Sequence, residues 1–398
     1  MPFQDRILNV MNKNRLVALV ASTSENVSYL CDVPQVPGVV SVAAAHGITF
    51  NEKGRETSLV IPAVAVDQWA QSDSPVKDVK IYGEFYYYKN EPLNYDALSL
   101  AEKKIVDVYF TQPRRTGEIV DALVGLFRER GLVKGRVGFD ETNVPPSRLR
   151  LIRKKLPKIK LVPASGIFQE IRMVKSPDEI ERIRKAVEAT EKGIQAVMEA
   201  SRPGVKNREL QFVYRTTIMK ENCTPFFGVI GAGTESAIVN HLPSEHVLQL
   251  GDIMRIDCNA VYRNYVSDVG RNAVIGTPSE KARKYFNALR KGTEEMERAI
   301  KPGLKFSELF HIAVSTVRKS GIPFYQRQNT GHSLGLQVVE PPIISPDSST
   351  KLLEDMVIAI ETPYYELGFG AFNPEDTVRV TKNGAEKLSK SENDLHAL

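Results

Sequence analysis

The sequence predicts a smaller α/β domain followed by an α+β domain with an internal pseudo-two-fold repeat and a curved antiparallel sheet covered by helices. At 398 residues the chain is longer than one ordinary hydrophobic core accommodates. Residues 1–168 alternate β-type runs with helical ones, and residues 169–398 contain a motif that occurs twice. We therefore place the domain boundary between residues 168 and 169.

The first domain shows a mixed α/β pattern. The aromatic run Tyr86–Tyr88 favours a further strand with one wet face, and no nucleotide-binding loop or nucleophile motif is found in this part. We expect strands at residues 16–20, 39–50, 57–64, 136–140 and 160–163, a turn at 51–54, and helices at 25–30 and 147–155.

A strong helix start opens the second domain. Ser176 suits the N-cap, Pro177 the first helical position, and Glu179 completes a capping box. The helix is expected to end at Arg202-Pro203-Gly204. One buried stripe follows from apolar residues at helical spacing, namely Ile180, Ile183, Val187, Thr190, Ile194 and Val197.

The second domain repeats itself. Pro203-Gly204-Val205-Lys206 recurs as Pro302-Gly303-Leu304-Lys305, and in both copies a helix precedes the Pro-Gly and another follows it. The parallel continues between residues 251–257 and 354–361. Two such helix–helix–sheet units would pack about an approximate two-fold axis, so a site at the seam would take ligands from both halves.

Two aspartates lie in the β-type runs on either side of a turn near Tyr262–Asn264. The turn brings Asp257 and Asp268 roughly level on adjacent strands. A buried carboxylate costs several kcal/mol unless a cation compensates it. The compensating group is either an arginine, such as Arg271, or a metal ion.

Two glutamates repeat this arrangement in the second half. Glu361 ends one apolar run, Glu375 begins the next, and the flexible loop around Gly368 lies midway between them. A hairpin centred on that loop puts the two glutamates opposite each other. His332 adds an imidazole to this set. It is flanked by Gly331 and Gly335, which allow the backbone to come close to a ligand.

Four carboxylates and one imidazole without a thiolate suit Mn²⁺, Fe²⁺ or Co²⁺, and Zn²⁺ is also compatible. Four carboxylates carry enough charge for two divalent ions. Two such ions generate a hydroxide at neutral pH and polarise a carbonyl. The sequence therefore predicts hydrolysis of an amide-like C–N bond.

Composition excludes several other classes. The formal charge of +5 is too small and dispersed for nucleic acid. No apolar run reaches signal-peptide or membrane-spanning length, so a cytoplasmic protein without membrane contact is expected. Cys31, Cys223 and Cys258 form no CxxC pair and indicate reduced packing residues.

The metal-ligand set Asp257, Asp268, His332, Glu361 and Glu375, in this order and context, resembles that of the pita-bread metallopeptidases. These include methionine aminopeptidase, prolidase, aminopeptidase P and creatinase, and residues before 170 resemble the N-terminal domain of prolidases and creatinase. The resemblance implies two metal ions bridged by Asp257 and Glu375, with Asp268 on one ion, and His332 and Glu361 on the other. It also implies Glu361 as the catalytic acid/base and a homodimer.

Three positions depart from the pattern of these peptidases. Asn240 stands where a histidine is expected, and His241 follows it at the place that creatinase uses, so His241 is a candidate catalytic residue. Val339 replaces a second substrate-binding histidine, and Asn373 replaces the prolidase-type arginine. Losing such donors costs transition-state stabilisation.

Three functions remain open. The first is a metal-dependent peptidase acting on short Xaa-Pro peptides. The second is a hydrolase of a small non-peptide C–N substrate, like creatinase or an ectoine hydrolase, which the altered histidines favour. The third is a binding protein without activity, against which the intact ligand set argues.

Overall fold

The computed structural model describes residues 4–34, 45–51, 56–112 and 117–398. The chain divides into two compact units, Met1–Ile171 and Arg172–Leu398. The expected boundary after residue 168 and the observed division both fall within helix α7 (Ser165–Met173). The first part of the expected strand 39–50 and most of the expected turn at 51–54 lie outside the described residues.

The first unit contains a six-stranded sheet in the order β4-β3-β2-β1-β5-β6. The pairs β3–β4, β1–β5 and β5–β6 are parallel, whereas β2 runs antiparallel to β1 and β3. Its strands are β1 (Ala18–Ala21), β2 (His46–Phe50), β3 (Ser58–Pro62), β4 (Asp78–Tyr82), β5 (Gly135–Phe139) and β6 (Ile159–Pro163).

Helices cover both faces of this sheet. Alternate side chains such as Val20 and Val137 face the core shared with α5 and α6, whereas Gly47 lies against Leu30 of α2, where an added Cβ would collide with Cys31. Besides α7, the helices are α1 (Gln4–Lys13), α2 (Ser24–Cys31), α3 (Val66–Gln71), α4 (Leu100–Tyr109), α5 (Ile119–Glu129) and α6 (Pro146–Lys155). The mixed α/β prediction for this part is therefore confirmed.

The expected strand at Tyr86–Tyr88 is wrong. These residues have no strand structure, and Tyr86 and Tyr88 are exposed. Tyr87 instead packs edge-on against Tyr109 of α4, whose hydroxyl accepts a hydrogen bond from the Tyr87 backbone N–H. A contact distant in the sequence, rather than strand pairing, holds this aromatic run.

The second unit is built on a curved ten-stranded sheet with the main path β12-β11-β13-β16-β10-β8-β7. Strand β17 pairs with β16, β18 with β10, and β9 with β8. The strands are β7 (Thr224–Ala232), β8 (Ile253–Tyr262), β9 (Tyr265–Val266), β10 (Val269–Val274), β11 (Gly331–Ser333), β12 (Glu340–Ile343), β13 (Val357–Glu361), β16 (Glu375–Thr381), β17 (Gly384–Lys387) and β18 (Leu395–Ala397). A separate hairpin joins β14 (Tyr364–Glu366) to β15 (Gly370–Phe372).

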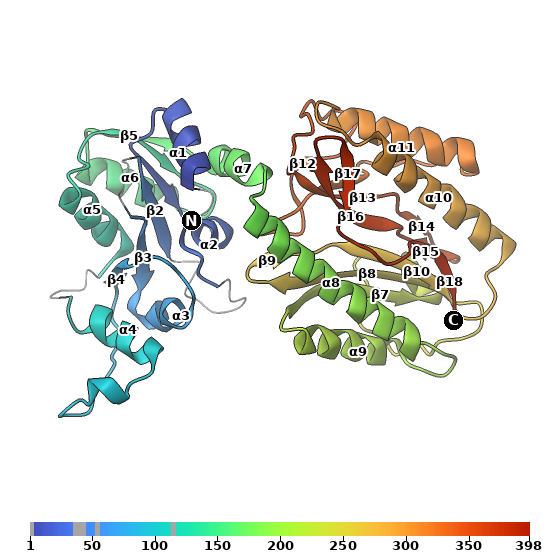
Figure 1. The fold of residues 1–398 in the computed structure, drawn as a ribbon, viewed down its shortest axis with the longest axis horizontal. Coiled ribbons are helices and arrows are strands. Elements are labelled where there is room, and N and C mark those ends of the chain that lie inside the picture. Colours follow the sequence, from blue (N-terminus) through green and yellow to red (C-terminus); the bar gives the residue numbers. More distant parts are fainter. Residues whose placement is uncertain (1–3, 35–44, 52–55, 113–116) are drawn as a thin grey trace. The chain divides into compact units, whose positions relative to one another are not determined.

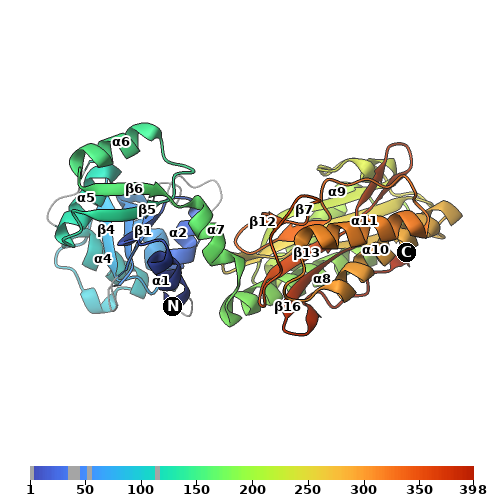
Figure 2. The same ribbon diagram turned by 90° about the horizontal axis from the view of Figure 1, so that it is seen from above.

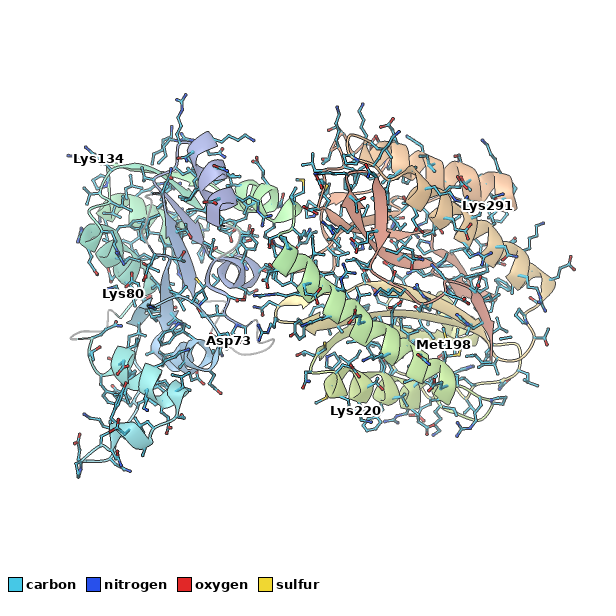
Figure 3. All side chains as sticks on the ribbon, viewed as in Figure 1. Asp73, Lys80, Lys134, Met198, Lys220 and Lys291 are labelled. Carbon is cyan, nitrogen blue, oxygen red and sulfur yellow. The ribbon has the colours of Figure 1, made fainter. Side chains whose placement is uncertain are left out.

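Two helix pairs pack on this sheet, as Figure 1 and the turned view of Figure 2 show. They are α8 (Pro177–Ala200) with α9 (Asn207–Lys220), and α10 (Glu280–Ala299) with α11 (Phe306–Ser320). Met198 and Lys220 lie at opposite ends of the first pair in Figure 3, as an antiparallel pair requires. None of the helices in the described part of the chain is long and apolar enough to cross a membrane.

The predicted start of α8 is confirmed. The Ser176 side chain accepts the Glu179 backbone N–H, Glu179 accepts the Ser176 backbone N–H, and Pro177 begins the helix. The expected apolar stripe is buried along its whole length. It fixes the face that α8 turns towards the sheet.

The internal repeat is equally clear in three dimensions. Gly204 and Gly303 both adopt a left-handed φ, of 92° and 93°. Each donates its N–H to a leucine carbonyl, that of Leu248 or Leu352, at 2.9 Å. The halves therefore share backbone hydrogen bonds as well as sequence, and strands β10 and β16 join them at the centre of the sheet.

Candidate metal centre

Three of the four predicted acids lie in one row across adjacent strands. Asp257 of β8 pairs with Gly270 of β10, Gly270 pairs with Glu375 of β16, and Glu375 pairs with Glu361 of β13. The predicted hairpin thus does bring Glu361 and Glu375 opposite each other. The row crosses the seam between the two repeats, and both halves contribute carboxylates to it.

The same row faces away from the helices. On β13, Ile358 and Ile360 enter the core formed with α10 and α11, and on β16, Val378 does the same. Because side chains alternate along a strand, Glu361 and Glu375 point to the opposite face. The hydrophobic core therefore fixes the direction in which the carboxylates point.

Asp268 reaches this face from the break between β9 and β10. Since Cys258 pairs with Val269, Asp268 lies opposite Asn259, diagonal to Asp257 rather than level with it. The Asn259 Nδ2 donates to the Asp268 Oδ1 at 2.6 Å and to the Ser267 carbonyl at 2.9 Å. Both aspartates still share one face, because diagonal neighbours on adjacent strands do so.

His332 lies on β11, next to β13 in the sheet. Its Nδ1 is 3.1 Å from the carbonyl oxygen of Ser333, so an Nδ1–H bond leaves Nε2 as the free lone pair. That Nε2 is 3.5 Å from the Asp268 Oδ2. Ligand atoms of Asp268, His332 and Glu375 all lie within 4.8 Å of one another, and all three residues are buried.

Burial raises the pKa of every acid in this group, and repulsion between carboxylates adds to it for Asp268, Glu361 and Glu375. Burial raises the pKa of Glu361 to about 7, and the charge of Asp257 contributes. The pKa of Asp268 and that of Glu375 lie well above their usual values, because of burial first and neighbouring carboxylates second. The pKa of Asp257 is also raised by burial, although Arg255 opposes the shift.

Among the described residues, Arg255 pairs with Asp257, and His332 lies 3.5 Å from Asp268, which is too little positive charge for four carboxylates. Buried acids in excess of cations are suited to hold divalent ions. Four oxygen-donor side chains and one free imidazole nitrogen fit two such ions. The five residues of the predicted ligand set are therefore suited to hold them.

Asn373 lies among the acids themselves. Its Nδ2 is 3.3 Å from the Asp257 Oδ2 and 3.1 Å from the Glu375 Oε2. A hydrogen bond from Asn373 also lowers the pKa of Glu361. The amide at this position thus contacts carboxylates of both repeats.

The other predicted substrate residues lie on two loops. Asn240 is exposed, and His241 is buried with its Nε2 3.1 Å from the Glu235 Oε2. The Nδ1 of His241 has no hydrogen-bond partner among the residues that the structure describes. Val339, between β11 and β12, is 54% exposed and offers only an alkyl side chain.

The expectation that Arg271 compensates an acid of the first hairpin is wrong. Arg271 does not pair with an acid of the first hairpin but binds Asp376 of β16, with Nη2 3.0 Å from Oδ1. The acid of the first hairpin, Asp257, pairs instead with Arg255 at 3.1 Å. Both arginines are almost fully buried, and alternation places them on opposite faces of the sheet.

Gly270 was missing from the predicted site. A Cβ on it would lie 2.4 Å from the Asn373 carbonyl oxygen and 2.8 Å from the Glu375 Cβ. The residue between Asp257 and Glu375 therefore has to lack a side chain. A glycine inside a β-type run, two residues after Asp268, is the sequence signal that indicates such a close approach.

The family models cover nearly the whole chain. Residues 181–382 match the model described as metallopeptidase family M24, and residues 4–174 match the creatinase/prolidase N-terminal domain. The chain belongs to metallopeptidase family M24. Its architecture is therefore a creatinase-type N-terminal domain followed by a pita-bread domain, as the sequence predicted.

Relatives of this M24 chain include two archaeal proteins named Xaa-Pro dipeptidase. That of Pyrococcus horikoshii is 26% identical over 394 residues, which cover 98% of this chain and 97% of the relative. That of Pyrococcus furiosus is 34% identical over 231 residues, 58% of this chain and 66% of the relative. The solved structure of an X-Pro aminopeptidase from Thermotoga maritima MSB8 shares the fold, with a TM-score of 0.80 at 20% identity over 99% of both chains.

Proposed function

We propose that this M24 protein is a metal-dependent peptidase that hydrolyses the amide bond before proline in short Xaa-Pro peptides. The observation that carries the proposal is the row Asp257–Gly270–Glu375–Glu361, with Asp268 and His332 on the same face. The Xaa-Pro dipeptidases of both Pyrococcus species support the choice of substrate.

The proposed ligand assignment follows the bridging pattern of the family. Asp257 and Glu375 would serve both ions, Asp268 would serve one, and His332 and Glu361 would serve the other. Mn²⁺, Co²⁺ or Fe²⁺ suits this donor set, and Zn²⁺ is also compatible. When bound, the ions supply a hydroxide at neutral pH and polarise the scissile carbonyl.

The side chains carry the proton and position the substrate. Glu361 takes the proton of the attacking water and returns it to the proline nitrogen as the C–N bond breaks. His241, held by Glu235 at 3.1 Å, is the candidate for a substrate contact, and its Nδ1 is buried with no hydrogen-bond partner among the described residues. Asn373 donates to the carboxylates and keeps them in place.

The alternative is hydrolysis of a small non-peptide C–N substrate, as in creatinase. One observation favours it: Asn373, at the place of the prolidase-type arginine, is bound to the acids and presents no positive charge to a substrate. A binding protein without activity is the third possibility, and the complete ligand set argues against it. The homodimer and the cytoplasmic location also belong to this proposal, and sedimentation of the purified protein tests the first.

The test is hydrolysis by metal-stripped protein resupplied with Mn²⁺, Co²⁺, Fe²⁺ or Zn²⁺. The panel contains Xaa-Pro dipeptides, a longer Xaa-Pro peptide, a Met-initiated peptide, creatine and ectoine. Metal-dependent cleavage of an Xaa-Pro bond is expected. Cleavage of creatine or ectoine alone would establish the alternative, and stoichiometric metal binding without any turnover would favour the binding protein.

A further inference from the structure

Two arginines lie near the catalytic acids, and they differ in how many partners they have. The positive charges of both Arg327 and Arg255 lower the pKa of Glu361, against the larger effect of burial. Their guanidinium carbons lie 5.6 Å and 5.2 Å from the centre of the Tyr365 ring. Tyr365 of β14 therefore contacts both cations.

Arg255 has at most one N–H left for a substrate, because four of its five are bonded within the protein. Its Nε donates to the Ser236 carbonyl at 3.0 Å, its Nη1 to Asp257 at 3.1 Å, and its Nη2 to the carbonyls of Ile238 and Val239 at 2.8 Å and 2.7 Å. The side chain is fully buried. Arg255 thus fixes the loop before His241 and one metal-ligand carboxylate.

Arg327, in contrast, is half-buried and has donors to spare. Its Nε donates to the Asn329 carbonyl at 3.4 Å, which is a long hydrogen bond. Across the described parts of both units, no carboxylate forms an ion pair with it. A guanidinium beside the acids, with both terminal nitrogens free of partners among the residues that the structure describes, is suited to a planar, bidentate anion.

The backbone around Arg327 is anchored on both sides. The Tyr325 hydroxyl donates to the Pro363 carbonyl at 3.1 Å, and the Tyr325 carbonyl accepts from Arg318 at 2.8 Å. On the other side, the Thr330 carbonyl accepts the Glu361 N–H at 3.1 Å. The guanidinium is therefore presented from a fixed segment that is hydrogen-bonded directly to the Glu361 strand.

We propose that Arg327, stacked on Tyr365, binds the carboxylate at the C-terminal end of a dipeptide substrate. The inference rests on the proposed peptidase function. In an Xaa-Pro dipeptide only one carbon separates that carboxylate from the scissile nitrogen, so a cation beside the catalytic acids reaches it. A longer peptide places a neutral carbonyl there, and Arg327 therefore selects dipeptides. This cation takes over a role that Asn373 lacks the charge to perform.

The test compares an Xaa-Pro dipeptide with the same dipeptide carrying a C-terminal amide, which removes the negative charge. Arg327→Met keeps an apolar side chain against Tyr365 but removes the guanidinium. For the free acid, kcat/KM is expected to fall about 30-fold, mainly through KM, as for the loss of a charge-assisted hydrogen-bond pair. For the amide, kcat/KM is expected to stay within about twofold, because the amide lacks the charge that the guanidinium binds.

Two further variants complete the design. Arg327→Lys keeps the positive charge but lacks the paired terminal nitrogens of the guanidinium. It is expected to recover part of the kcat/KM that Arg327→Met loses. Arg202→Met, on an exposed arginine after α8, is the matched control and should leave both substrates unchanged. Equal losses for acid and amide in Arg327→Met, or no loss in either, would overturn the inference.

Calorimetric titration of both dipeptides into metal-loaded protein separates this inference from the proposed function. If neither dipeptide is cleaved but the acid binds about 30-fold more weakly to Arg327→Met than to the wild type, the peptidase proposal fails and the carboxylate site stands. If the wild type and Arg327→Met bind the acid equally, the carboxylate site is rejected, whether or not cleavage occurs.

Discussion

Glu361 and Glu375 are direct cross-strand partners on β13 and β16, and Gly270 separates Glu375 from Asp257 on the next two strands. Two like charges in direct cross-strand register destabilise a sheet. The register is nevertheless fixed. If either strand slipped by one residue, its core side chains would turn to the face of the sheet that carries the acids. The fold therefore forces carboxylates together and creates the demand for cations.

Removal of the metal is expected to make stability fall as pH rises. A carboxyl whose pKa is higher in the folded state than in the unfolded state binds more protons when folded, so its contribution is complete at low pH and is lost as pH increases. For Glu361 the window runs from its usual value of 4.5 to about 7. Thermal unfolding in chelator from pH 5 to 8 should show a falling Tm, and the trend should vanish with Mn²⁺. A chelated protein whose Tm is independent of pH would contradict the raised pKa values.

Gly270→Ala should weaken metal binding and activity together. The new Cβ would collide with the backbone oxygen of Asn373 and with Glu375, so strands β10 and β16 have to separate. Overpacking of this kind costs about 1–3 kcal/mol. Calorimetric metal titration and chemical denaturation measure the two effects. Gly125→Ala, at an exposed position in α5 with open space around it, is the control and should slightly stabilise the protein.

Glu361→Gln should abolish turnover while preserving the fold. The amide has the size of the carboxyl but cannot take the proton of the attacking water, and loss of such a group costs about 10²–10⁴-fold in kcat. The measurement combines circular dichroism for the fold, the metal stoichiometry, and kcat on an Xaa-Pro dipeptide. Glu366→Gln, which only breaks contacts with Lys281 and Tyr364 on β14, should retain activity within about twofold because it lies outside the acid row. Full activity of Glu361→Gln would refute the assigned role.

Arg255→Met should destabilise the protein strongly. The substitution leaves three backbone carbonyls and Asp257 without their donor, and removing one partner of a buried pair costs about 3–5 kcal/mol. Urea unfolding of the metal-free protein gives the free energy of unfolding. Arg298→Met removes an exposed ion pair with Glu295 and should change that free energy by less than about 1 kcal/mol. Similar losses in both variants would argue against the structural role of Arg255.

Much of the site was predictable because its geometry is local. The Ser176 cap, the two Pro-Gly corners and the hairpin that joins Glu361 to Glu375 depend on residues close together in the chain. A turn of known length fixes the register of its two strands, so opposing carboxylates follow directly from their distances to Gly368. His332 was suggested as a ligand by its glycine context together with the four strand acids.

The partner of Arg271 was not predictable in this way. Arg255 of β8 is the chain neighbour of Ile256, which pairs with Arg271 of β10, yet Arg255 binds Asp257 and Arg271 binds Asp376. Arg255 and Asp257 lie two residues apart on β8, whereas Arg271 meets Asp376 only because β10 pairs with β16, which joins the two repeats across the centre of the sheet. The sequence offered Arg271 as the compensating cation, and only the strand order assigned it elsewhere.

The sequence by itself determined the candidate ligand types, the hairpins and the repeat, since caps, turns and alternation act over a few residues. The tertiary structure decided which groups share a face and a row. It placed Gly270 between two carboxylates, engaged Asn373 with them, and set Arg327 on Tyr365 with its fork unoccupied. The contacts of Gly270 with Glu375 and of Asn373 with Asp257 join residues that are far apart in the chain, and they arise only when the two halves of the sheet pair at their centre. The contact of Arg327 with Tyr365 forms within the second half.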